Sequence, residues 1–235
     1  MKTLDNLHEV IRELRETRVR GNVTITQISP YIDVALTILP EDIASEVDSV
    51  VNKLEESNFS TNLGAYNKYL AGRIKKEFAL DVSGFSADFI NYIFHTAENL
   101  LYANKVLSKQ YLKFSSVRDR LYLHDMWVNF QEKYEYNPPH KHAGLYSFVI
   151  WNRIPFKLED ELKVFPTTSD SGPNTNSAFA FLIPEDGSVD NLNIPVTKDM
   201  QNFMCMFPSD LMHCVHPFFT SDGYRVSLSG NIKIA

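Results

Sequence analysis

The sequence reads Tyr136-Asn-Pro-Pro-His140-Lys-His142 near its middle and Phe207-Pro-Ser-Asp-Leu-Met-His213-Cys-Val-His-Pro217 further downstream. His140 and His142 are two positions apart, and side chains at that spacing on an extended strand project to the same side. An apolar run at 202–207 and a Pro-Ser turn precede His213, which indicates a second strand. We therefore predict that the fold brings His140, His142 and His213 together around one metal ion.

A third motif, Arg225-Val-Ser227, lies on what the pattern indicates is the following strand. The planar guanidinium of Arg225 can bind a carboxylate through two parallel hydrogen bonds. Neutral imidazole nitrogens are suitable ligands for Fe(II). The histidines and the arginine together predict a mononuclear iron site with an anion clamp beside it.

These stretches resemble the Fe(II)- and 2-oxoglutarate-dependent oxygenases, especially the prolyl-hydroxylase-like branch with its phage and bacterial members. The resembling residues are 137–142, 207–217 and 225–231, and the resemblance runs from about Trp127 to the C-terminus. It implies Fe(II) as cofactor, with 2-oxoglutarate and O2 as co-substrates. It also implies that His140 and His213 bind iron, and that Arg225 and Ser227 hold the distal carboxylate of 2-oxoglutarate.

Position 142 departs from the family pattern, because the family usually has a carboxylate there and this chain has His142. Three interpretations stay open. His142 binds the metal in a three-histidine site, or it turns away and leaves an additional open position. In the third, the register shifts, so that His142 takes the place of the first ligand and Gly144 that of the carboxylate. Asp125, Glu132 or Glu135 could supply a carboxylate, although their spacing does not require it.

Further side chains are weaker candidates for contact with 2-oxoglutarate or substrate, because of their phase on the expected strands. At such positions a side chain more often belongs to the core or the surface. These candidates are Asn129, Gln131, Tyr136, Asn137, Tyr146, Trp151 and Asn231. His8, His95 and His124 are expected to be structural, and His216, three residues after His213 and before a proline, is expected to cap the turn or face the other way rather than to replace His213 as ligand.

The expected fold class is α+β with a mainly β core. The resemblance implies a double-stranded β-helix, a jelly-roll barrel, braced by N-terminal helices, whereas periodicity alone supports only a helix-backed β-sandwich. We expect one domain over 1–235, with mostly helical support over about 1–115 and the catalytic core over about 116–235. Helices are predicted over 3–17, from 40, and over 64–78 and 86–107, and strands over 23–28, 32–39, 120–131, 146–151, 178–183 and 202–207.

Composition limits the classes of partner. The formal net charge of −6 gives no electrostatic basis for wrapping nucleic acid. There is no signal-peptide pattern and no apolar run of membrane-spanning length, so a soluble, cytoplasmic protein is expected, in the host cytoplasm if it is phage-encoded. Cys205 and Cys214 are expected to be reduced core thiols. The N-terminal helix could serve a homodimer.

The function implied by the resemblance is hydroxylation of an unactivated C–H bond in a peptide, protein or small molecule, with a peptidyl prolyl residue as the leading substrate. Two alternatives remain. A cupin-type dioxygenase with three histidines would not use 2-oxoglutarate. A non-catalytic jelly-roll binding protein would hold structural zinc or no metal at all.

Overall fold

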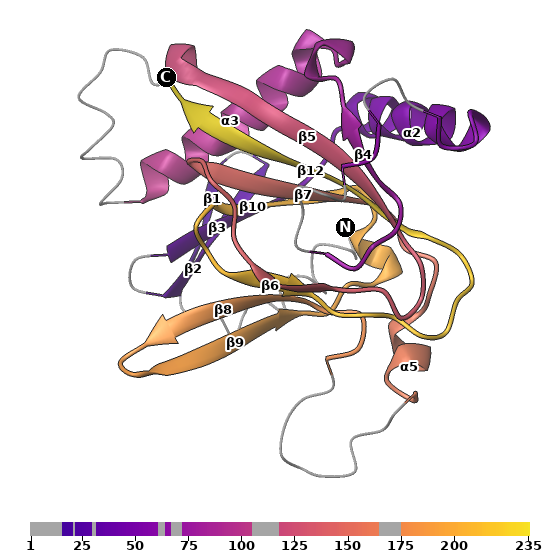
Figure 1. Cartoon of the computed structure of the whole chain (residues 1–235). Helices are drawn as coiled ribbons and strands as arrows, with labels where there is room; N and C mark the ends of the chain where they lie inside the picture. The colour runs from indigo at the N-terminus through magenta and orange to yellow at the C-terminus, as the bar shows by residue number, and fades with distance from the viewer. Residues whose placement is uncertain are drawn as a thin grey trace.

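The computed structural model of the chain describes residues 22–29, 32–60, 64–66, 72–104, 118–164 and 175–235, and the backbone alone for 16–20. Two β-sheets face each other, and two long helices cover the outer face of the larger sheet (Figure 1). The three predicted ligand histidines lie on or directly after strands of the smaller sheet.

The larger sheet has eight strands, all paired antiparallel with their neighbours. Its order is β1 (Glu16–Arg20), β2 (Val23–Ser29), β3 (Ile32–Ile38), β10 (Phe203–Pro208), β7 (Tyr146–Arg153), β12 (Arg225–Ile234), β5 (Leu121–Gln131) and β4 (Glu77–Leu80). The smaller sheet has the order β6 (Asn137–His140), β11 (His213–Val215), β8 (Phe179–Glu185) and β9 (Ser188–Ile194). Because the chain crosses repeatedly from one sheet to the other, the fold is the predicted jelly roll.

Helices α2 (Glu41–Glu56) and α3 (Ala87–Ala103) pack their apolar sides on the larger sheet. Helix α2 follows Pro40, carries Glu41 and Asp42 in its first turn, and buries residues at helical spacing. Helix α3 begins where the Ser86 hydroxyl accepts a hydrogen bond from the Phe89 amide at 3.1 Å. Shorter helical segments are α5 (Leu158–Glu161), η2 (Val82–Gly84), η3 (Arg118–Arg120) and η4 (Lys198–Met200).

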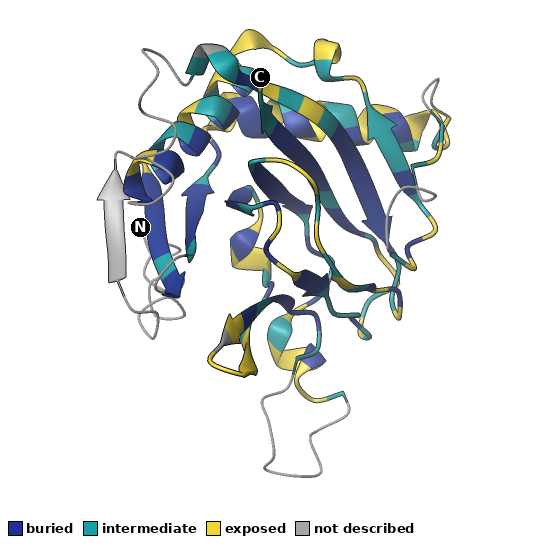
Figure 2. Cartoon of the chain, turned by 60° about the vertical axis from the view of Figure 1, so that its left-hand side comes forward, coloured by how far each residue is buried: buried dark blue, intermediate teal, exposed yellow. Residues whose placement is uncertain are grey.

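The central strands of the larger sheet are buried on both faces (Figure 2). Along β7, Phe148 and Ile150 join the core under the helices, whereas Val149 and Trp151 join the core between the sheets. This alternation follows from the two-residue period of a strand. It also explains why 146–151 reads as a continuous apolar run rather than as an alternating one.

Most predicted elements are confirmed, with two exceptions. The helix predicted over 64–78 is wrong for its described residues: Ala65 forms a bridge with Phe78, and β4 pairs with β5. An open sheet edge that offers a full set of backbone hydrogen bonds outweighs a weak helical pattern. Residues 16 and 17, predicted to end the first helix, belong to β1, and the rest of that helix lies outside the described residues.

Both cysteines are free and buried, as predicted. Burial raises the pKa of the Cys205 thiol, which keeps it protonated. None of the helices in the described ranges has the length and apolar character that a membrane crossing needs.

Candidate metal centre

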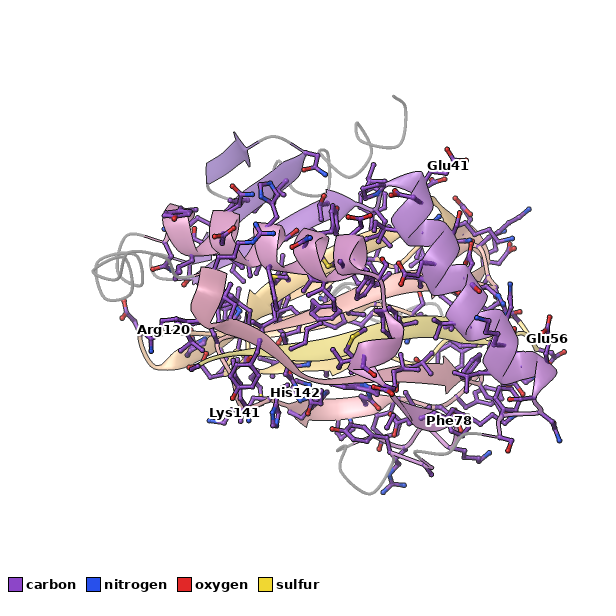
Figure 3. The ribbon with its side chains drawn as sticks, turned by 90° about the horizontal axis from the view of Figure 1, so that it is seen from above. Glu41, Glu56, Phe78, Arg120, Lys141 and His142 are labelled. Carbon is purple, nitrogen blue, oxygen red and sulfur yellow. The ribbon has the colours of Figure 1, made fainter. Side chains whose placement is uncertain are left out.

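His140, His142 and His213 lie together inside the jelly roll. Strands β6 and β11 pair so that His140 is directly opposite His213, and His142 follows just after β6. The potential ligand atoms of the three side chains all lie within 4.8 Å of one another. Figure 3 shows His142 beside Lys141, whose side chain is exposed while the histidines are half-buried or buried.

Backbone carbonyls orient two of the imidazoles. His140 Nδ1 lies 2.7 Å from Pro138 O, and His213 Nδ1 lies 2.9 Å from Leu211 O. A carbonyl can only accept, so Nδ1 carries the proton in both rings and Nε2 keeps its lone pair. Such outer contacts fix the tautomer that a metal ligand requires.

Burial keeps the three imidazoles neutral. It lowers the pKa of His213 to about 3 and that of His142 to about 4, with further lowering from the neighbouring histidines. It lowers the pKa of His140 as well. Three neutral imidazoles with converging lone pairs fit Fe(II), and in the described part of the chain this cluster contains no carboxylate.

The histidines line a chamber whose empty volume is about 440 Å³, a figure that includes the open space at its mouth. The Trp127 ring lies 5.3 Å from His142, and the rings of Phe207 and Phe179 lie 4.8 and 5.6 Å from His213. These apolar walls limit the access of water. The other lining residues are Asn129, Asn137, Ser147, Phe148, Val149, Val215, Ser227 and Ser229.

A polar network that includes Asp125 approaches His142. Asp125 accepts hydrogen bonds from Asn231 at 2.7 Å and from Tyr66 at 3.0 Å. Ser147 donates to Asn231 at 2.7 Å. The carboxylate of Asp125 opposes the lowering of the His142 pKa, so it contributes negative charge near the cluster without belonging to it.

Ser227 lines the chamber, whereas Arg225 lies beyond it on the same face of β12. Arg225 is 3% exposed and donates to Gln131 Oε1 (3.0 and 2.7 Å), Ser177 O (2.6 Å) and His216 O (2.7 Å). Burial lowers its pKa to about 9, with Glu161 partly offsetting the effect, so the guanidinium is charged at neutral pH. The hydrogen-bond partners of Arg225 are all neutral oxygens, so none of these contacts compensates its positive charge.

The weaker candidates are divided among the chamber, the core and the surface. Asn129 and Asn137 line the chamber. Gln131 contacts Arg225, and Asn231 contacts Asp125, so both lie outside the lining. Tyr146 and Trp151 are buried in the two cores. Tyr136 is 36% exposed.

Sequence reasoning missed the lining residues Trp127, Ser229 and Ser147. Trp127 and Ser229 are in phase with Asn129 and Ser227 on β5 and β12, and the two strands pair Trp127 with Ser229. Strand alternation could therefore have found both. Ser147 depends on the position of β7 beside β12, which no local pattern in the sequence indicates.

Glu77 is a buried acid beside this chamber that was not predicted. It pairs with Asn129 across β4 and β5, and it is 0% exposed. Both of its carboxyl oxygens lack a hydrogen-bond partner in the described part of the chain. The same is true there of the Oδ1 atoms of Asn129 and Asn137. Burial, with a smaller contribution from Glu135, raises the pKa of Glu77 to about 7.

We expect Glu77→Gln to stabilise the protein at pH 8. The folded pKa of Glu77 is raised from 4.5 to about 7, so the folded state binds more protons than the unfolded state between these values. Stability therefore falls as pH rises through that window, and the loss is complete above it. Urea unfolding at pH 8 should show a gain of roughly 1–3 kcal/mol for Glu77→Gln, shrinking toward zero near pH 4.5.

Glu56→Gln is the matched control, because Glu56 is exposed at the end of α2. It should change stability little at either pH. An equal effect of Glu77→Gln at both pH values would contradict a buried carboxyl that titrates near neutrality.

Residues 125–231 match the family model described as "Putative 2OG-Fe(II) oxygenase". Solved structures that align with the chain include a Pseudomonas putida prolyl-4-hydroxylase (13% identity, 86% of this chain and 92% of that chain, TM-score 0.46). They also include a Trichoplax adhaerens prolyl hydroxylase in complex with a hypoxia inducible factor peptide fragment (13% identity, 98% of this chain and 89% of that chain, TM-score 0.48). A third is the α-ketoglutarate-dependent epimerase SnoN from nogalamycin biosynthesis (13% identity, 86% of this chain and 76% of that chain, TM-score 0.48). No curated protein sequence matches the chain.

Proposed function

We propose that this chain, whose residues 125–231 match the 2OG-Fe(II) oxygenase family model, hydroxylates an unactivated C–H bond with Fe(II) held by His140, His142 and His213. Enzymes of this class use Fe(II), 2-oxoglutarate and O2. The observation that carries the proposal is the three-histidine cluster, whose ligand atoms lie within 4.8 Å of one another and whose side chains line the chamber.

The chamber provides a path for 2-oxoglutarate. It runs from the histidines to Ser227, and Arg225 lies next along the same face of β12. We propose that the distal carboxylate of 2-oxoglutarate binds Ser227 and Arg225, so that its keto-acid end faces the histidines. Arg225 then gains the anionic partner that its neutral contacts do not supply.

When bound, Fe(II) and 2-oxoglutarate supply the oxidising chemistry, in which 2-oxoglutarate and O2 give succinate and CO2 while one oxygen atom enters the substrate C–H bond. The protein binds and orients the reactants. His140 and His213 are oriented through their Nδ1 contacts to backbone carbonyls. Trp127, Phe179 and Phe207 limit water around the histidines.

The three-histidine set also affects the charge balance. A site with three neutral imidazoles leaves both positive charges of Fe(II) uncompensated by protein ligands, whereas a carboxylate ligand would cancel one. An anionic co-ligand is then strongly favoured, so we propose that Fe(II) affinity rises markedly when 2-oxoglutarate is added. Asp125 near His142 offsets this effect only in part, because it lies outside the cluster.

For the substrate we propose a peptidyl prolyl residue, on the resemblance of residues 137–142, 207–217 and 225–231 to the prolyl-hydroxylase-like branch. Mass spectrometry of proline-containing peptides incubated with the iron-loaded protein tests it. A gain of one oxygen atom on proline is the expected product.

The test of the proposed function is succinate formation by anaerobically iron-loaded protein that is then exposed to O2. We expect turnover of 2-oxoglutarate by the wild type. Because even the outer contacts of a metal ligand are worth about 10- to 100-fold, loss of the ligand itself in His142→Ala should lower turnover by about 100-fold or more. His142→Asp should retain much of the activity, since a carboxylate is the ligand that the family usually has at this position.

Equal turnover in His142→Ala and wild type would show that His142 is not a ligand. Iron binding without any succinate from the wild type would contradict the proposed use of 2-oxoglutarate. It would favour instead a three-histidine dioxygenase that binds its substrate directly, a candidate supported by the lack of a carboxylate in the described cluster.

A further inference from the structure

Gln131 makes the two-point contact that orients the Arg225 guanidinium. The two residues are paired across β5 and β12, and Gln131 is 2% exposed. Its Oε1 accepts from Nε of Arg225 at 3.0 Å and from Nη2 at 2.7 Å. Two donors of one planar group converge on one oxygen, which fixes the rotation of the guanidinium.

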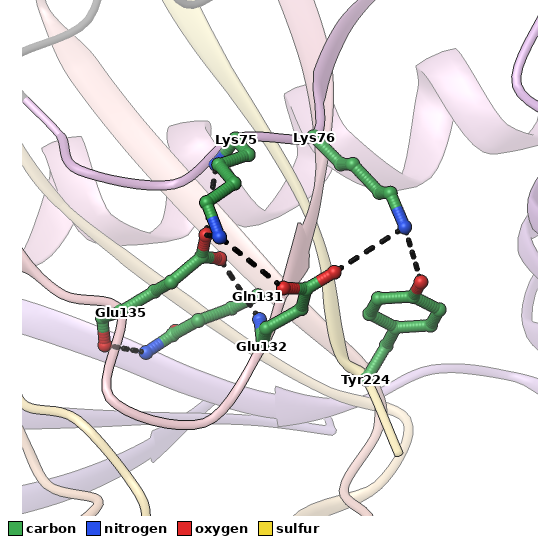
Figure 4. Close-up of polar contacts among 6 residues, drawn as sticks. All are labelled: Lys75, Lys76, Gln131, Glu132, Glu135 and Tyr224. Atoms are coloured by element: carbon green, nitrogen blue, oxygen red, sulfur yellow. Dashed lines mark hydrogen bonds and ion pairs between the residues drawn. The ribbon is translucent and has the colours of Figure 1, made fainter. Parts of the chain in front are cut away.

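The amide of Gln131 is itself held in one orientation (Figure 4). Its Nε2 donates to the backbone oxygen of Glu135 at 2.6 Å. The Glu135 carboxylate in turn accepts from the backbone amides of Glu132 at 2.9 Å and Lys75 at 3.2 Å. A carbonyl cannot donate, so a flipped amide would lose its contacts on both sides, and Oε1 must face Arg225.

The acids nearest to Gln131 in sequence are engaged by lysines rather than by Arg225. Glu132 pairs with Lys76 at 3.3 Å and with Lys75 at 3.6 Å, and Glu135 pairs with Lys75 at 3.8 Å (Figure 4). Lys76 also donates to Tyr224. The side chain of this group that contacts the buried cation is therefore the uncharged amide of Gln131.

Neutrality at position 131 is significant because buried arginines are usually paired with an acid. Glutamate has nearly the size and shape of glutamine, and it would form an internal ion pair with Arg225. Glu161, the acid that acts on the pKa of Arg225, accepts hydrogen bonds from the amides of Phe219 and Thr220, each at 2.8 Å. The positive charge of Arg225 is thus oriented but not cancelled by a direct contact.

We propose that Gln131 is a positioning residue that orients Arg225 while leaving its charge for the distal carboxylate of 2-oxoglutarate. The proposal rests on the proposed function, in which Arg225 binds that carboxylate. It makes the uncharged amide at position 131 a determinant of co-substrate selectivity.

The test compares Gln131→Glu with Gln131→Met by two readouts. The first is thermal unfolding of the metal-free protein without ligand. The second is equilibrium binding, under anaerobic conditions with Fe(II), of 2-oxoglutarate and of 2-oxobutyrate, which lacks the distal carboxylate. Gln201→Glu is the charge control, because Gln201 is exposed.

We expect the two readouts to rank the variants in opposite order. Both variants lose the hydrogen bond to Glu135 O, but Gln131→Glu supplies an ion pair for Arg225, so its unfolding temperature should exceed that of Gln131→Met. Its affinity for 2-oxoglutarate should fall about 10- to 100-fold, against less than about 10-fold for Gln131→Met, because its carboxylate competes for the guanidinium. Binding of 2-oxobutyrate should change little in either variant or in the Gln201→Glu control.

A role for Gln131 in packing alone would rank stability and 2-oxoglutarate affinity in the same order, and that result would overturn the inference. Equal 2-oxoglutarate affinity in the two Gln131 variants would overturn it as well. If the wild type does not prefer 2-oxoglutarate to 2-oxobutyrate, the proposed clamp itself fails. The two failures are therefore distinguishable.

Discussion

His213→Ala should reduce Fe(II) affinity on the order of 100-fold or more, since even the outer contacts of a metal ligand are worth about 10- to 100-fold. His213 is the most buried of the three histidines, and it is directly opposite His140 in the β6–β11 pair. Its removal leaves two imidazoles and a cavity between Phe207 and Phe179. Titration of the metal-free protein with Fe(II) under anaerobic conditions measures the effect.

His216→Ala is the matched control, because His216 follows β11 and its ring contacts Cys214 Sγ at 3.7 Å rather than the cluster. It should leave Fe(II) affinity within a few-fold of the wild type. A larger loss in His216→Ala than in His213→Ala would transfer the distal ligand role to His216. Circular dichroism of both variants checks that the fold persists.

The histidines and most of the strands could be predicted because they depend on local pattern. The spacing of His140 and His142 fixes their common side on a strand. The acids after Pro40 and the helical spacing of buried residues locate α2. The alternation along 120–131 indicates β5. Each of these signals lies within about a dozen residues of sequence.

The surroundings of Arg225 could not be predicted, because they come from three distant parts of the chain. Gln131, Ser177 and His216 meet at this side chain only after β5, β8, β11 and β12 have taken their places in the two sheets. Gln131 was a candidate for direct contact with 2-oxoglutarate or substrate, but its oxygen is directed at Arg225. No periodicity distinguishes these two roles.

Glu77 is a second residue whose surroundings could not be predicted from the local sequence. The pattern around it predicts a helix, where its side chain would be one polar residue among others. Pairing with Asn129 at the sheet edge places it instead between the sheets, where burial raises its pKa. A buried acid without partners costs stability, and such exceptions tend to occur at functional sites.

Arg225→Met should weaken 2-oxoglutarate binding at least about 30-fold, because removing one partner of a buried charge pair costs roughly 2–5 kcal/mol. The effect should be confined to ligands with a distal carboxylate, so binding of 2-oxobutyrate should be nearly unchanged. Equilibrium binding of both keto acids to the Fe(II)-loaded variant measures this difference. Methionine keeps the apolar length of the side chain above the rings of Phe156 and Phe218, which lie 5.9 and 5.7 Å from the guanidinium carbon.

Arg225→Lys separates charge from geometry. Lysine keeps the positive charge but cannot make the paired contact of Nε and Nη2 with Gln131. If charge alone holds the carboxylate, Arg225→Lys should bind 2-oxoglutarate within a few-fold of the wild type. If the orientation imposed by Gln131 matters as well, its affinity should fall between those of the wild type and Arg225→Met, which is the result that the geometry predicts. Unchanged affinity in Arg225→Met would remove Arg225 from the co-substrate site and leave the other polar side chains that line the chamber, which are Asn129, Asn137, Ser147, Ser227 and Ser229.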